Sequence, residues 1–120
     1  MTSTWGADEL DRIGSTEEVQ IAPVGVGYTT IWVVRVGDDL YVRSYRGRGG
    51  VWFRAALQRH EGRIRAGDIE RDVTFVEPDD VDQAAIDQAY RSKYAAHSRT
   101  YVDPMVAPTA VAATLRLIRR

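Results

Sequence analysis

Residues 29–45 restrict the chain to folds that contain a β-sheet. Residues 29–36 read TTIWVVRV, with β-branched and aromatic side chains on both faces, which predicts a central strand buried on two sides. The Gly37-Asp38-Asp39 that follows has the composition of a turn. Because residues 40–45 continue with a second strand pattern, we expect a β-hairpin over residues 29–45.

The rest of the chain alternates between strand and helix patterns. Further strands are expected at residues 18–22, 63–66, 69–76 and 110–118, and the middle two form a hairpin around Gly67-Asp68. Helices are expected at residues 7–13, 51–60 and 80–96, of which the last is the longest. Residues 97–110, with Pro104 and Pro108, are expected to form a loop.

Length and composition indicate one domain over residues 1–120, with residues 1–16 as a polar lead-in. The absence of cysteine excludes a disulfide scaffold, a thiolate metal site and a cysteine nucleophile. No apolar run is long enough to span a membrane, and no charged-then-apolar leader opens the chain. We therefore expect a soluble, cytoplasmic protein that does not interact with membranes.

The net charge of −1 averages over two unlike segments. Residues 41–65 hold seven arginines and one acid, Glu61, whereas residues 66–90 hold eight acids and one arginine. Because the acidic segment interrupts any continuous basic footprint, we expect no nucleic-acid partner.

The segment with the strongest functional signal is residues 41–54, YVRSYRGRGGVWFR, where a strand crosses into a helix. Glycines allow the main chain to approach an anion closely, and the first N–H groups of a helix attract negative charge. Arginine forks bind phosphate or carboxylate oxygens in pairs. The pattern predicts an anion site, with phosphate favoured, and leaves open a solvated arginine-rich loop. The residues concerned are Arg43, Arg46, Gly47, Arg48, Gly49, Gly50 and Arg54.

Aromatic residues surround this segment and suit a flat heterocyclic ligand that carries a phosphate. Tyr45 and Trp52 are the better ligand candidates, because they lie nearest the glycines. Trp32 and Phe53 are expected to pack in the core.

A second polar and aromatic group lies near the end of the longest expected helix. Lys93, the only lysine, suits an anion or an acidic partner, but cations also complement a helix C-terminus. The sequence leaves open whether Lys93, Tyr94 and Arg99 are functional or structural. Asp87 and Arg91 have the spacing of a helical ion pair.

Patterns for protein-based catalysis are weak. His60 and His97 are far apart and have no carboxylate cluster beside them, so no metal site is expected. There is no GxSxG elbow, and Ser44 has no base near it in sequence. If the protein is an enzyme, we expect a cofactor to carry the reactivity.

The order of hairpin strand, glycine loop, helix and two further strands resembles the flavin-binding split-barrel superfamily. These segments read LYVRS-YRGRGG-VWFRAAL, GRIRAG and DIERDVTFVEP. That superfamily includes pyridoxamine-phosphate-oxidase-like proteins and deazaflavin-dependent nitroreductases. The whole chain, with TTIWVVRV, IDQAYRSKY and AATLRLI, more closely resembles a small bacterial family known only as a domain of unknown function. Where the nitroreductase helix pattern W-Y-x-N-L has its Asn, Ala55 or Ala56 stands here.

The resemblance implies a mainly β (α+β) fold, a six-stranded split β-barrel with two or three peripheral helices. It implies a homodimer that holds FMN or a deazaflavin in the groove between its subunits. Arg43, Ser44, Arg46, Gly47, Arg48, Gly49 and Gly50 would lie at the cofactor phosphate, and Thr30 and Trp32 near the ring. The implied activity is that of an oxidoreductase acting on a small organic substrate. The alternative is a module on the same fold that binds a small anion or ligand without cofactor or catalysis.

Overall fold

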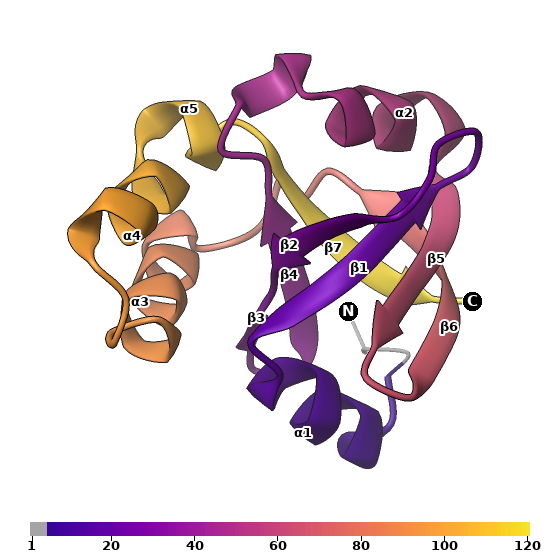
Figure 1. Cartoon of the computed structure of the whole chain (residues 1–120), viewed down its shortest axis with the longest axis horizontal. Helices are drawn as coiled ribbons and strands as arrows, with labels where there is room; N and C mark the ends of the chain where they lie inside the picture. The colour runs from indigo at the N-terminus through magenta and orange to yellow at the C-terminus, as the bar shows by residue number, and fades with distance from the viewer. Residues whose placement is uncertain (1–4) are drawn as a thin grey trace.

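The computed structural model describes residues 5–120, so the first four residues of the expected lead-in lie outside it (Figure 1). The strands are β1 (Glu18–Pro23), β2 (Thr29–Trp32), β3 (Val34–Val36), β4 (Asp39–Arg43), β5 (Glu61–Ala66), β6 (Ile69–Val76) and β7 (Thr114–Arg119). The helices are α1 (Ala7–Ser15), α2 (Val51–Arg59), α3 (Gln83–Lys93), α4 (Arg99–Val106) and α5 (Pro108–Val111), with a 3₁₀ turn, η1 (Gly47–Gly49).

The seven strands form one antiparallel sheet in the order β2-β1-β5-β6-β7-β4-β3. The sheet curls until β2 contacts β4, which makes a nearly closed, barrel-like sheet in a mixed α+β fold (Figure 1). The expected count of six strands is wrong by one, because the strand expected at residues 29–36 is divided in two.

The division falls at Val33. Before it, β2 pairs with β1, and after it, β3 pairs with β4, at the other end of the sheet order. The main chain of Val33 is bound by side chains from the end of α3 instead: its N–H donates to the Tyr94 hydroxyl at 3.2 Å, and its carbonyl accepts from Lys93 Nζ at 2.6 Å. The expectation of a central strand buried on both sides is therefore wrong. Thr29 and Thr30 are exposed, at one end of the sheet order.

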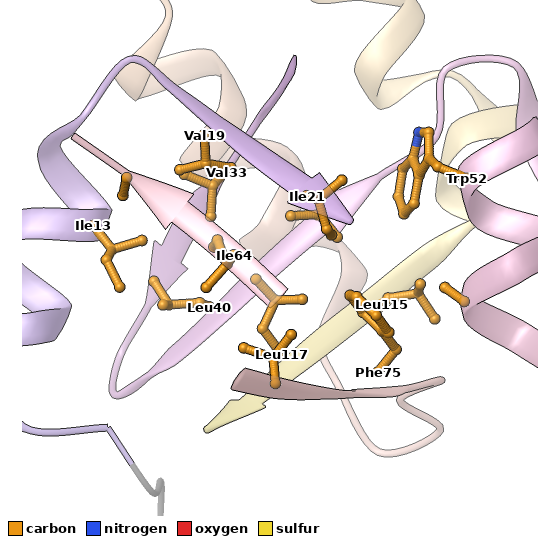
Figure 2. Packing of buried hydrophobic residues seen from close by; sticks show 14 of the residues in the cluster. Ile13, Val19, Ile21, Val33, Leu40, Trp52, Ile64, Phe75, Leu115 and Leu117 are labelled. Atoms are coloured by element: carbon orange, nitrogen blue, oxygen red, sulfur yellow. The ribbon is translucent and has the colours of Figure 1, made fainter. Parts of the chain in front are cut away.

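The main hydrophobic cluster fills the barrel (Figure 2). Alternating residues of the strands point into it, among them Val19, Ile21, Ile64 and Leu117. The start of the chain packs there too: Trp5, Leu10 and Ile13 are buried in this cluster, and the Trp5 indole nitrogen donates to the Leu117 carbonyl at 2.8 Å. Residues 5–16 thus contribute three side chains to the core and are not only a polar lead-in.

A second cluster lies between the sheet and the α3–α4 layer. It is formed by Val34, Tyr41, Ile86, Tyr90, Tyr94, Val102 and Met105. None of the helices in the described residues 5–120 is long and apolar enough to cross a membrane.

The helices from residue 80 onward differ from expectation in where they begin and in how many there are. The longest helix begins at Gln83 and not at residue 80, because the Asp82 side chain caps it by accepting from the Ala84 and Ala85 N–H groups. The loop expected at residues 97–110 is wrong, since α4 and α5 occupy it. Pro108 starts α5, where its missing N–H costs nothing. Five helices therefore replace the expected two or three, and the last strand begins only at Thr114.

Candidate functional site

The division at Val33 opens a gap in the barrel wall. The β3–β4 pairing ends at Val34 and Tyr41, whereas β4 continues to Arg43 and β2 turns away to pair with β1. A groove of about 720 Å³ occupies the space between β2, the end of β4, the start of α2 and helix α4. This volume is typical of sites for small molecules and cofactors.

Eight of the eleven predicted site residues line this groove: Thr30, Trp32, Arg43, Ser44, Tyr45, Arg46, Gly50 and Trp52. The other three, Gly47, Arg48 and Gly49, do not line it. Gly47 instead has a φ of +78°, and a Cβ there would lie 2.6 Å from the Thr109 side chain, so it lets η1 pack against α5. Whether the eight bind a cofactor remains a prediction.

At one end of the groove lies the hydroxyl of a buried serine. Ser44 is 3% exposed, and its main-chain N–H donates to the Ala113 carbonyl at 3.1 Å. Within the described chain, no hydrogen bond reaches its Oγ. Gly50 lies against this hydroxyl, since a Cβ at Gly50 would be 2.7 Å from Ser44 Oγ. The missing Cβ therefore keeps the Ser44 hydroxyl accessible from the groove.

Helix α2 begins at the same place. Its N-cap is Gly50, which has no side chain to accept from the first N–H groups, and its first turn holds no acid. An uncapped helix N-terminus carries partial positive charge and free donors. Val51 and Trp52, the first two residues of α2, line the groove, so the start of the helix borders the Ser44 end.

Arg46 adds a cation to this end. Its guanidinium lies 5.4 Å from the centre of the Tyr45 ring, and its Nε donates to the Tyr45 hydroxyl at 3.1 Å. No carboxylate in residues 5–120 pairs with it. Arg48 differs, because it is engaged by Glu77 and by the Ala112 carbonyl. The hydrogen bond from Arg48 lowers the pKa of the Glu77 carboxyl.

The contrast extends to the whole basic segment. Four of its seven arginines pair with carboxylates of the acidic segment that follows: Arg43 with Asp87, Arg48 with Glu77, Arg63 with Asp72 and Arg65 with Glu70. Arg46, Arg54 and Arg59 have no such partner in residues 5–120. The local excess of positive charge is thereby reduced to a few side chains, of which Arg46 lines the groove.

Arg43 has no donor left for a ligand. Its side chain is buried, and all five N–H groups have acceptors inside the protein. The acceptors are Thr114 Oγ1, Asp87 Oδ1, the Met105 carbonyl, and the carbonyl and Oε1 of Gln83. Arg43 therefore holds the groove together, and the prediction that it contacts a phosphate does not fit this geometry.

The aromatic wall is supported from behind. The Trp32 ring stacks on Tyr94 with centroids 3.8 Å apart and planes within 5°. The hydroxyl of Tyr94 in turn donates to the Glu17 carbonyl at 2.6 Å. Trp32 thus packs on the second cluster, as expected, and also lines the groove. Phe53 is fully buried, also as expected, whereas Tyr45 is exposed.

The far wall was missed by the sequence patterns. Thr100, Tyr101, Pro104 and Met105 line the groove from α4, where a loop was expected. The signal for a helix was the spacing of the buried Val102 and Met105, but Pro104 between them argued against it.

Lys93 and Tyr94 are structural parts of the Val33 crossing, and burial lowers the pKa of Lys93 to about 8. The expected pair of Asp87 with Arg91 is wrong: Asp87 binds Arg43, and Arg91 lies 3.7 Å from Asp103. Arg99, at the start of α4, is exposed beside the groove residue Thr100. Among residues 5–120, no group of three or more His, Asp or Glu side chains is arranged to hold a metal ion.

One solved structure similar to this chain is that of the FAD and heme binding protein from Mycobacterium smegmatis. The two chains are 18% identical with a TM-score of 0.41, and the similarity covers 93% of this chain and 64% of that chain. This chain thus spans less than two thirds of the length of that structure. No curated protein matches the sequence. The resemblance to an uncharacterised bacterial family is confirmed by a family model that matches residues 9–117, and the chain belongs to the family described as "Uncharacterized protein conserved in bacteria (DUF2255)".

Proposed function

We propose that the groove binds a flavin or deazaflavin that carries a phosphate, with the phosphate at the Ser44 end and the ring along β2. The observation that carries this proposal is the Ser44 hydroxyl, which belongs to a residue only 3% exposed, has no hydrogen bond within residues 5–120 and is bordered by a glycine. A hydroxyl that no protein group engages is available both to donate to and to accept from a ligand oxygen.

The Ser44 end has the donors that a phosphate needs. The hydroxyl and the Arg46 guanidinium come from the connection between β4 and α2, and the uncapped start of α2 follows directly. Helix N-termini and arginine forks both favour phosphate over neutral groups. The absence of a Cβ at Gly50 leaves room for an oxygen beside the hydroxyl.

The remainder of the groove suits a flat ring. Trp32 is held by its stack on Tyr94 and offers a fixed surface, and Tyr101 and Met105 lie on the α4 wall. The resemblance of the hairpin, loop and helix to the flavin-binding split barrels supports the same placement. When bound, a flavin or deazaflavin supplies hydride transfer, and this chain's residues bind and orient it. An oxidoreductase acting on a small organic substrate is the activity that we propose for the loaded protein.

We also propose that the protein is a homodimer and that the partner copy covers this groove. Three of the exposed large hydrophobic residues, Tyr45, Val51 and Tyr101, are 57%, 74% and 65% exposed, and all three line the groove. Apolar side chains gathered at one exposed place are typical of interfaces. Light scattering of the purified protein should give twice the chain mass, and a monomer at all concentrations would contradict the dimer.

The test of the proposed function is titration of the purified protein with FMN and with a deazaflavin, followed by visible absorbance and fluorescence. We expect micromolar or tighter binding of at least one. The Ser44→Ala variant should bind it more weakly, whereas Ser98→Ala, at the exposed start of α4, should not. Failure of both cofactors to bind at micromolar concentrations would exclude the proposal. If inorganic phosphate raised the melting temperature as much as FMN did, the cofactor-free anion-binding alternative would be favoured.

A further inference from the structure

The groove touches four consecutive residues of one strand. Thr29, Thr30, Ile31 and Trp32 all line it. Successive side chains of a strand point to opposite faces, so a cavity against one face would touch only every second residue. The groove must therefore lie along the edge of β2, where the main chain itself is exposed.

β4 approaches that edge, but no strand within residues 5–120 pairs with it. β2 is the end of the sheet order and pairs only with β1. No hydrogen bond within residues 5–120 reaches the main chain of β2 from the other side. Unpaired N–H and C=O groups at a strand edge are strong and directional donors and acceptors.

The register shows which groups face the groove. The Val24 N–H donates to the Glu61 carbonyl at 3.0 Å, so the main-chain N–H and C=O groups of every second residue, counted back from Val24, point to β5. The main-chain groups of the residues between them, Val19 and Ile21, point to β2. Their partners in β2 are Ile31 and Thr29, whose main-chain groups are thereby used. The N–H and C=O of Thr30 and of Trp32 therefore point to the open edge.

We infer that the main chain at this edge recognises the ring of the bound ligand through hydrogen bonds. To form them, the ring must present an N–H beside a C=O, as an imide or cyclic amide does. In an antiparallel edge, the N–H and C=O of one residue lie side by side and form two bonds with a group that offers the complementary pair. The inference rests on the proposed function and assigns the selective contact to the main chain of Thr30.

A small ring fits better than an extended peptide. The edge is four residues long, about 13 Å at the usual rise of a strand, and it lines the same groove as Ser44 and Arg46. A peptide strand would continue beyond both ends of β2. The ring of a flavin or deazaflavin carries one imide N–H between two carbonyl groups, which is the chemistry that this edge would recognise.

The ligand arm of the test uses FMN and 5-deazariboflavin 5′-phosphate, each compared with its N3-methyl analogue, in fluorescence titrations of the unaltered protein. Methylation removes the imide N–H and keeps the ring, the linker and the phosphate. We expect the N3-methyl analogue of whichever parent binds to lose affinity at least about tenfold. Equal affinities would overturn the inference and leave the proposed function intact, whereas no binding of either parent would overturn both.

The protein arm compares Thr30→Pro with Thr30→Val. Proline removes the outward N–H and leaves the β1 ladder, which uses Thr29 and Ile31, in place. We expect Thr30→Pro to lose affinity about tenfold for the parent and little for the N3-methyl analogue, while Thr30→Val binds both as the unaltered protein does. If Thr30→Val lost as much as Thr30→Pro, the side chain and not the main chain would be the contact. If Thr30→Pro failed to fold, the ligand arm would decide alone.

Discussion

The Arg43 guanidinium and the Asp87 carboxylate meet at 2.5 Å between β4 and α3, although 44 positions separate them in the sequence. This pair replaces the i,i+4 pair that the spacing of Asp87 and Arg91 favours. It also removes Arg43 from the set of arginines available to a ligand. The same guanidinium donates to the Met105 carbonyl, so it fixes the α4 wall of the groove relative to β4.

Arg43→Met should lower the free energy of unfolding by about 3 kcal/mol, because it leaves polar groups of α3 and β7 without their buried partner. Urea denaturation followed by tryptophan fluorescence measures this. Arg54→Met is the matched control, since Arg54 is exposed on α2 and should change stability by less than about 0.5 kcal/mol. Equal effects of the two substitutions would show that the network around Arg43 adds nothing.

Arg46→Ala should weaken binding of the phosphate-bearing cofactor about tenfold or more, because a charge-assisted contact is lost. Arg48→Ala should leave the affinity within about twofold, since its guanidinium is held by Glu77 away from the groove. Fluorescence titration of both variants checks the difference. Similar losses of affinity in both variants would show that the anion is bound by the whole loop and not by Arg46 in particular.

Gly50→Ala should cost about 1–2 kcal/mol in stability, because the added Cβ would lie 2.7 Å from Ser44 Oγ. In a Ser44→Ala background the same change should cost less, since the oxygen that it meets is gone. Denaturation of the two single variants and the double variant gives the coupling directly. Strict additivity would mean that the cost comes from the N-cap position alone.

Lys93 should make stability rise with pH between about 8 and 10. Burial lowers its pKa in the folded state to about 8, while an unfolded lysine keeps a value near 10.4. In that interval the unfolded chain binds more protons, so the free energy of unfolding increases with pH. Lys93→Met should lack this increase in denaturation series at pH 7 to 9.5.

Burial raises the pKa of Tyr90 and Tyr94 in both proteins, so their opposing effect on the free energy of unfolding above about pH 10 cancels in the comparison. Parallel profiles of the free energy of unfolding against pH in the unaltered protein and Lys93→Met would contradict the lowered pKa of Lys93.

Local patterns identified the elements whose hydrogen bonds are local. The β5–β6 hairpin around Gly67 and the strand at residues 18–22 are confirmed, and α2 follows the glycine loop as its spacing indicated. These segments carry their own turn residues and periodicity, so little outside them decides their structure.

The Val33 crossing could not be predicted in that way. Residues 29–36 form a continuous apolar run, and nothing within it shows where the strand leaves one end of the sheet for the other. The position is fixed by Lys93 and Tyr94, which are about 60 residues away and bind the Val33 main chain. The candidate groove exists because of this crossing. Its loop and strand residues were thus found from sequence, whereas its shape and its α4 wall were not.

The open edge of β2 also bears on how the protein behaves in concentrated solution. An unpaired strand edge can pair with the same edge of another molecule, which is a common start of aggregation. A ligand seated along Thr30 and Trp32 would block such pairing. We therefore expect the protein without ligand to aggregate faster on storage than the protein with ligand bound.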